Sequence, residues 1–395
     1  MQLWRGGGST SQNATEQQEH KLQELQEKLA KAEKQNELLN SQKSDIEKEL
    51  NEQKQTLEQQ TAHYKKLQDE QKAIDADLAK AKSDLEQQKQ TYNKLQDDKN
   101  TTDIELEKAK LALAEKENAY KTLETQKSAI ETELNSVKEN LASLNQNAAA
   151  WNVINLKLSE LLTTPGELET PSFKKEEDNS YAVRITKQLN PQDLNNGLYK
   201  RPAISMTSGD SGDGIMAGDY YIYKQTFSTI YAYNWLAGSE SGQNKTASTL
   251  PRGGSFRISY FDNNKLTTDI PDKGQATYRG ESFNADNKGK LEYTVDFNQR
   301  TGSGRIYDQA NHLPDISLDS GNINGSNIRS TASINEEQAG IYQVSFYGDQ
   351  AQEIAGEVYI DRELENAVRT NGNTQAKYEG KVRGVAFGIA GTKQQ

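Results

Sequence analysis

Histidine, the residue that most often performs acid–base catalysis, occurs only three times in this 395-residue chain. There is no cysteine, which excludes disulfides, thiolate nucleophiles and thiolate metal ligands. Gly209-Asp210-Ser211-Gly212 resembles the loop that presents a nucleophilic serine, but such a site needs an upstream histidine and aspartate beside the serine. The two upstream histidines, His20 and His63, both fall in a predicted long helix. We therefore interpret the tetrapeptide as a coincidence and expect no enzyme.

The stretch from Ser208 to Asp219 is rich in glycine and aspartate, and carboxylates of this kind could bind calcium. It lacks the ligand order and the final glutamate of an EF-hand loop, so we interpret it as a flexible loop. The formal net charge of −11 argues against a partner that presents phosphates, such as nucleic acid. The sequence predicts no metal and no cofactor.

Aromatic residues are the better candidates for a binding site. Side chains alternate between the two faces of a β-strand, so the aromatic run from Tyr220 to Trp235 cannot all enter one core. One interpretation is that one face packs against neighbouring β structure while the other forms cross-strand pairs. The functional interpretation is an exposed patch of the kind enriched at binding hot spots. Its predicted ligand-binding residues are Tyr221, Tyr223, Tyr231, Tyr233 and Trp235.

The N-terminal part of the chain has the pattern of a long coiled-coil helix. Neither glycine nor proline occurs between Gly8 and Pro165, and an apolar heptad continues without a slip from Leu22 to Trp151. A single helix of this length would be on the order of 190 Å long. We call the a and d positions the seam. Its predicted core residues at a are Leu22, Leu29, Leu50, Leu57, Tyr64, Leu78, Leu85, Tyr92, Leu106, Leu113, Tyr120, Leu134 and Leu141.

Because no break is evident at which this helix could fold back, we expect its partner to be another copy of the chain. Most flanking charges favour a parallel, in-register pairing, with attractive pairs such as Lys28–Glu33 and Glu133–Lys138, whereas Glu70–Asp75 repels. Leucine at a with isoleucine at several d positions favours a trimer, which we place ahead of a dimer, while lysine at a favours fewer strands. An unpaired charged helix is the alternative.

After Pro165-Gly166 the helical periodicity ends and short alternating β segments follow one another. The first are predicted at Tyr181–Thr186, at Tyr220–Tyr233 as one strand, and at Ser255–Phe261. About eight short antiparallel strands without intervening helices predict a closed up-and-down β-barrel. Its strands are predicted at Ala276–Phe283, Lys290–Phe297, Ser303–Tyr307, Asp315–Leu318, Ser330–Ile334, Ile341–Tyr347, Ile354–Ile360 and Gly384–Ala390.

Several ordered motifs in this region resemble the barrel of the transferrin-binding protein B family, which includes the neisserial factor H-binding protein and heparin-binding antigen. They are the segments from Gly274 to Gly280, Leu291 to Phe297, Gly302 to Ile306, Phe346 to Glu357 and Phe387 to Lys393. The resemblance implies a β-rich handle before the barrel. The predicted fold is α + β in separate domains: a flexible tether over 1–15, a parallel coiled-coil stalk over 16–162, a linker over 163–180, the handle over 181–272 and the barrel over 273–395.

The resemblance also implies a surface lipoprotein on the outer membrane of a Gram-negative bacterium, held by an inferred N-terminal lipid anchor. We expect it to capture a host protein, with a complement regulator of the factor H type as the leading hypothesis for immune evasion. The first alternative is acquisition of iron or haem through transferrin, haemoglobin or haem, for which His312 is the one candidate haem ligand. The second alternative is a structural adhesin or spacer.

Overall fold

In the computed structural model the chain forms two compact units, residues 48–148 and residues 1–47 with 149–395. The residues that it describes are 9–164, 168–169, 172–174, 181–187, 191–208, 214–239, 247–250, 256–310, 313–360 and 385–395. The Gly209–Gly212 loop and the candidate haem ligand His312 lie outside them. Among the described helices, none combines the length and the apolar character needed to cross a bilayer.

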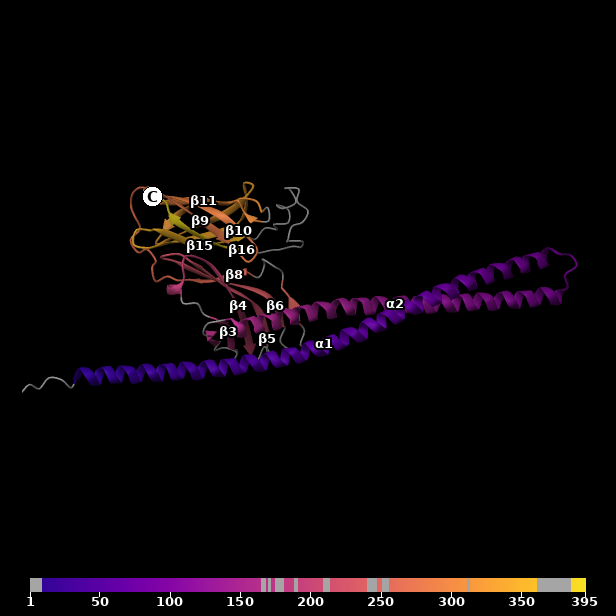
Figure 1. The fold of residues 1–395 in the computed structure, drawn as a ribbon. Helices are drawn as coiled ribbons and strands as arrows, with labels where there is room; N and C mark the ends of the chain where they lie inside the picture. Colours follow the sequence, from indigo (N-terminus) through magenta and orange to yellow (C-terminus); the bar gives the residue numbers. More distant parts are fainter. Residues whose placement is uncertain are drawn as a thin grey trace, which may run out of the picture. The chain divides into compact units, whose positions relative to one another are not determined.

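Two helices, α1 (Ser9–Asp97) and α2 (Asp103–Thr163), replace the predicted single helix (Figure 1). The break needs neither glycine nor proline, because side chains close both helix ends. The Asp98 carboxylate accepts the backbone N–H of Asn100 at 2.9 Å. Thr102 and Glu105 form a reciprocal capping box, in which Thr102 N donates to Glu105 Oε2 at 3.0 Å and Glu105 N donates to Thr102 Oγ1 at 3.3 Å. The expectation of an unbroken helix was wrong.

Within residues 48–148 the two helices pack antiparallel. The polar contacts between them run in opposite directions along the chain: Asp84 meets Lys116 at 3.6 Å, Asp75 meets Lys127 at 2.7 Å, and His63 meets Glu133 at 3.1 Å. In a parallel pair of helices Asp75 would repel Glu70, whereas in this hairpin Asp75 forms an ion pair with Lys127. Lys127 occupies a seam position, and the hydrogen bond and charge of Asp75 raise its pKa.

Along both helices of the hairpin, the positions of the predicted seam are mostly the less exposed ones. Leu50, Leu67, Leu85 and Val137 are buried within a single chain. The predicted partner of the α1 seam was wrong over this stretch. A second copy of the chain was expected to cover the seam, and α2 covers it instead. The single rod is wrong for the same reason, and α1, with 89 residues, is roughly 130 Å long.

The handle is an eight-stranded sheet in which β1, β3, β4, β5, β6 and β7 follow in order, with β2 paired to β3 and β8 paired to β6. A short 3-10 turn at Pro191–Asp193 precedes β4. The strands are β1 (Leu168–Glu169), β2 (Ser172–Lys174), β3 (Tyr181–Lys187), β4 (Gly197–Ser208), β5 (Gly214–Lys224), β6 (Thr229–Ser239), β7 (Ala247–Thr249) and β8 (Phe256–Phe261).

The segment predicted as one strand from Tyr220 to Tyr233 is a hairpin. Strands β5 and β6 pair antiparallel on either side of a four-residue turn, with Tyr220 opposite Tyr233 and Lys224 opposite Thr229. The turn residues Gln225 to Ser228 include no glycine, proline or asparagine, which are the usual turn signals. The prediction of a continuous strand was wrong because this turn is stabilised from a distant part of the chain.

The barrel closes by pairing of its last strand, β16, with its first, β9, as the sequence predicted. Its interior is filled by large side chains such as Tyr278, Tyr293 and Phe346, and the hydroxyl groups of Tyr293 and Tyr342 lie 3.0 Å apart. Burial raises the pKa of Tyr342 to about 12. The strands are β9 (Gln275–Phe283), β10 (Lys288–Asp296), β11 (Thr301–Tyr307), β12 (Ile316–Asn324), β13 (Asn327–Ile334), β14 (Glu337–Tyr347), β15 (Glu353–Ile360) and β16 (Val385–Lys393).

The capping box leads to a first prediction. Thr102→Ala removes the hydroxyl that accepts the Glu105 N–H, and loss of an N-cap of this kind costs about 1 kcal/mol. The thermal midpoint of the helical circular-dichroism signal should therefore fall. Thr101→Ala, at the neighbouring threonine outside the box, should leave the midpoint nearly unchanged. Equal effects of the two substitutions would show that no helix begins at this position.

Candidate functional site: the outer face of the handle

A buried carboxylate from the barrel fixes the handle in place. Glu353, at the start of β15, is almost fully buried and accepts hydrogen bonds from the backbone N–H groups of Thr226 and Phe227, each at 2.9 Å, and from the Ser228 hydroxyl at 3.0 Å. Gln225 Nε2 adds a bond to the Ile354 carbonyl at 3.1 Å. All these donors lie in the β5–β6 turn, so the barrel adds its hydrogen bonds to the turn's own bond from Gln225 N to the Ser228 carbonyl at 2.8 Å.

The inner face of the handle, which carries Tyr221 and Tyr223, packs against the barrel. Tyr223 stacks on Phe283 with ring centroids 4.9 Å apart, and its hydroxyl donates to Glu281 at 3.0 Å. Tyr221 lies edge-on to Phe256 at 5.6 Å. Burial, followed by the charge of Glu281, raises the pKa of Tyr223, so its phenol stays a neutral donor. These two tyrosines belong to a joint core with the barrel.

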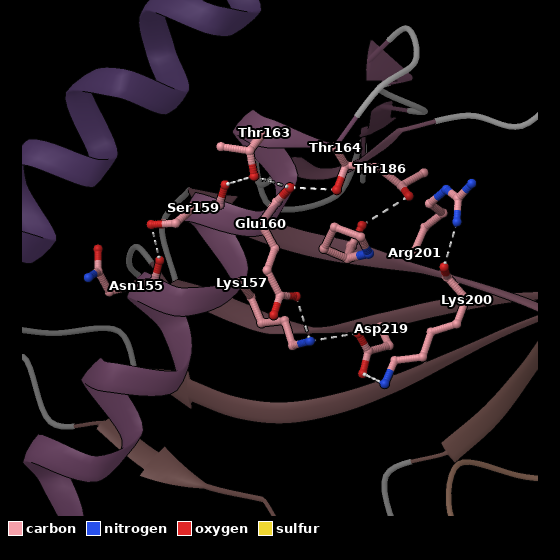
Figure 2. A network of polar contacts seen from close by, with 11 residues as sticks. Asn155, Lys157, Ser159, Glu160, Thr163, Thr164, Thr186, Lys200, Arg201 and Asp219 are labelled. Carbon is pink, nitrogen blue, oxygen red and sulfur yellow. Dashed lines mark hydrogen bonds and ion pairs between the residues drawn. The ribbon is translucent and has the colours of Figure 1, made fainter.

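The C-terminal end of α2 is fixed to the handle by a buried ion pair (Figure 2). Lys157 Nζ lies 2.8 Å from Asp219 Oδ1 on β5 and 2.8 Å from Glu160, while Lys200 on β4 reaches the other Asp219 oxygen at 3.3 Å. Burial alone would lower the pKa of Lys157, but the hydrogen bonds to Asp219 and Glu160 outweigh it and raise that pKa. Buried leucines and isoleucines of α2 flank this lysine, at Ile154, Leu158 and Leu161.

The outer face of the handle carries a continuous aromatic ladder. Tyr260 of β8 stacks on Tyr231 of β6 with centroids 4.1 Å apart, and Tyr231 stacks on Tyr220 of β5 at 6.1 Å. Tyr220 meets Tyr233 at 4.8 Å, and Tyr233 stacks on Trp235 at 5.3 Å. Burial, with the nearby Tyr260 and Tyr233, raises the pKa of Tyr220 far above its usual value. The phenol of Tyr220 is therefore uncharged at neutral pH.

The ladder reaches solvent at both ends. Tyr260 is 51% exposed, and Trp235 is half-buried. Arg201 and Arg257 stand on the same face, since Arg201 pairs with Tyr220 and Arg257 with Tyr233. Tyrosine, tryptophan and arginine are the residue types enriched at binding hot spots. The outer face therefore has the composition of a protein-binding surface.

The structure divides the five predicted ligand-binding residues between the two faces. Tyr231, Tyr233 and Trp235 lie together on the outer face, whereas Tyr221 and Tyr223 lie on the inner face. The four tyrosines are all buried, so they do not form the exposed patch that the sequence suggested. As ligand contacts, the five residues stay a prediction. The sequence analysis missed Tyr260, whose place in the ladder follows from the pairing of β8 with β6.

The described residues hold no group of three or more histidines, cysteines or carboxylates that could bind a metal. His63 contacts Glu133 between α1 and α2, far in sequence from the Ser211 that it would have to activate. The barrel interior is closed to a haem-sized ligand by its packed tyrosine, phenylalanine and isoleucine side chains.

One family model matches part of the barrel. Residues 268–358 match the family model described as factor H binding protein, C-terminal. The match spans β9 to near the end of β15 and less than a quarter of the chain. It confirms, for the barrel, the resemblance to the family of bacterial surface lipoproteins that was seen in the sequence motifs.

Solved structures show a distant likeness. HpuA from Kingella denitrificans, solved in complex with human haemoglobin, is 13% identical over 59% of this chain and 89% of its own, with a TM-score of 0.27. Transferrin Binding Protein B from Haemophilus parasuis, as a Trp-176-Ala mutant, is 12% identical over 58% of this chain and 54% of its own, with a TM-score of 0.26. Intact Ap-TbpB is 10% identical over 59% and 39%, with a TM-score of 0.23.

The joint between handle and barrel gives a second prediction. In Glu353→Gln, the amide NH2 group cannot accept the hydrogen bonds that a carboxylate oxygen accepts, so buried donors of the β5–β6 turn lose their partner. An unsatisfied buried donor costs about 1–3 kcal/mol. The urea midpoint of the near-ultraviolet circular-dichroism signal should fall clearly.

Glu357→Gln is the matched control, four residues further along the same strand. Burial raises the pKa of Glu357. At a pH above the usual pKa of a glutamate, its charged form therefore destabilises the folded state. Its neutral amide should leave the urea midpoint unchanged or slightly higher. A Glu353→Gln variant as stable as Glu357→Gln would contradict the role given to Glu353.

Proposed function

We propose that this chain is a non-catalytic binding protein of the bacterial surface that captures a host protein. The match of residues 268–358 to the factor H binding protein family is the observation that carries the proposal. The family is one of host-protein receptors without catalytic activity. A complement regulator of the factor H type is the ligand that this match favours, and its capture would protect the bacterium from complement.

The outer face of the handle is the proposed contact surface. The aromatic ladder offers large, preordered rings with Tyr260 exposed at one end, and Arg201 and Arg257 add cationic donors on the same face. Preordered aromatic side chains lose little conformational entropy on binding, which favours affinity. The inner face is occupied by the barrel and by the end of α2, so it is closed to a partner of protein size.

Iron acquisition is the second candidate function. HpuA of Kingella denitrificans was solved with haemoglobin, and TbpB is named for transferrin. If this chain has such a ligand, the packed barrel interior favours capture of the whole carrier protein over capture of free haem. A structural adhesin or spacer is the third candidate, and it would need no ligand at the ladder. Attachment to the outer membrane through an N-terminal lipid is part of the proposal.

Binding of the full chain to immobilised factor H, transferrin and haemoglobin tests these functions. We expect saturable binding to factor H by surface plasmon resonance. Tyr260→Ala and Trp235→Ala should each weaken it by more than about 1 kcal/mol, roughly fivefold in the dissociation constant, because they remove exposed or half-exposed rings of the ladder. Tyr359→Ala, at a tyrosine exposed on the barrel wall, is the matched control and should bind like the unchanged chain.

Saturable binding to transferrin or haemoglobin instead of factor H would assign the second function. Absence of binding to all three, with no host protein retained from serum, would contradict capture of a host protein. If Tyr359→Ala weakens binding as much as Tyr260→Ala, the contact surface lies on the barrel and not on the handle.

A further inference from the structure

The N-terminal end of α1 extends past the end of α2. Helix α1 has 89 residues and α2 has 61, so in an antiparallel pair the first 28 residues of α1 have no part of α2 opposite them. We call this segment, residues 9–36, the overhang. The heptad continues through it in the same register as through the hairpin, with Leu22 and Leu29 at a and Leu25 at d.

The seam is exposed in the overhang and buried beyond it. Leu22, Leu25 and Leu29 are 58%, 55% and 60% exposed, whereas Leu39 and Ile46, the d residues that follow, are 0% and 4% exposed. The helix is otherwise polar around the overhang, and Lys28 pairs with Glu24 one turn earlier at 3.4 Å. A leucine stripe in water on an otherwise charged helix is the pattern of an unfilled coiled-coil seam.

We propose that the overhang pairs in parallel with the same segment of a second copy, forming a short two-stranded coiled coil. Asn36, which is exposed, occupies an a position at the end of the stripe. A single asparagine at a specifies a register and favours two strands, because each asparagine can hydrogen-bond to its counterpart. The isoleucines at d that favoured three strands, Ile46, Ile74 and Ile130, lie beyond the overhang.

The charges beside the stripe select the parallel orientation. In a parallel pair, Lys28 at g of one copy meets Glu33 at e of the other, and the second such pair follows by symmetry. In an antiparallel pair g faces g and e faces e, so Lys21 and Lys28 can meet each other but no glutamate, and Glu19 and Glu33 can meet each other but no lysine. The parallel arrangement therefore gains two attractions, whereas an antiparallel one brings like charges together. It does not depend on which host protein the handle binds.

Sedimentation equilibrium of the full chain tests the pairing. The unchanged chain should show a concentration-dependent monomer–dimer equilibrium. Leu29→Glu should raise its dissociation constant by about tenfold or more, because it places a charge in the seam. Leu111→Glu is the matched control, since Leu111 is also 60% exposed but lies outside the seam, and it should dimerise like the unchanged chain. Far-ultraviolet circular dichroism checks that each variant keeps its helices.

A charge exchange tests the orientation. Lys28→Glu should weaken the dimer, and Lys28→Glu with Glu33→Lys should restore it, although the contact of Lys28 with Glu24 is lost in both variants. Because the chain has no cysteine, Leu22→Cys should also form an interchain disulfide readily, whereas Leu111→Cys should not. A chain that stays monomeric up to its solubility limit, equal effects of Leu29→Glu and Leu111→Glu, or no rescue by the double exchange would each overturn the proposal.

Discussion

The buried carboxylate of Glu353 is the interaction on which the arrangement of the binding head depends. It lies at the start of a barrel strand and accepts hydrogen bonds from a handle turn that has no glycine or proline of its own. By holding that turn, it sets which face of the handle meets the barrel. Tyr221 and Tyr223 are thereby committed to a shared core, and the ladder from Tyr260 to Trp235 is left on the other face. The Lys157–Asp219 ion pair acts in the same way at the end of α2, since a buried charge that loses its partner is strongly destabilising.

The two helices show how one sequence pattern can satisfy different partners. Parallel and antiparallel coiled coils use the same a and d positions, so the heptad identified the buried residues of the hairpin but not what covers them. The decisive residues were local: Asp98, Thr102 and Glu105 close the helix ends without glycine or proline. The T-x-x-E spacing from Thr102 to Glu105 is a sequence-level signal for a helix start. Where α2 ends, the same seam is uncovered, and this exposure is the basis of the proposed pairing with a second copy.

The strands could be predicted where apolar and polar residues alternate along them. Near-regular alternation predicted eight barrel strands, although the one predicted at Asp315–Leu318 covers only the start of β12. The motifs around Gly274–Gly280 and Phe346–Glu357 gave the resemblance to the family whose model matches residues 268–358. The β5–β6 turn could not be predicted, because the carboxylate that stabilises it is 127 residues away from Thr226 in the sequence. The placement of the aromatic residues on the two faces could be predicted only in part, for a similar reason. Alternation implied that the aromatic run would divide between two faces, but it did not say which face the barrel covers, and Tyr260 joins the ladder through strand pairing alone.

Hydrogen–deuterium exchange of the full chain, with and without the serum protein that it retains, tests the central claim most directly. That claim is that the outer face of the handle contacts the host protein. It predicts slower exchange on binding in peptides that cover β6 (Thr229–Ser239) and β8 (Phe256–Phe261), with no change in the hairpin residues 48–148. Protection confined to the hairpin, with unchanged exchange in β6 and β8, would contradict the claim and make the helices the binding element.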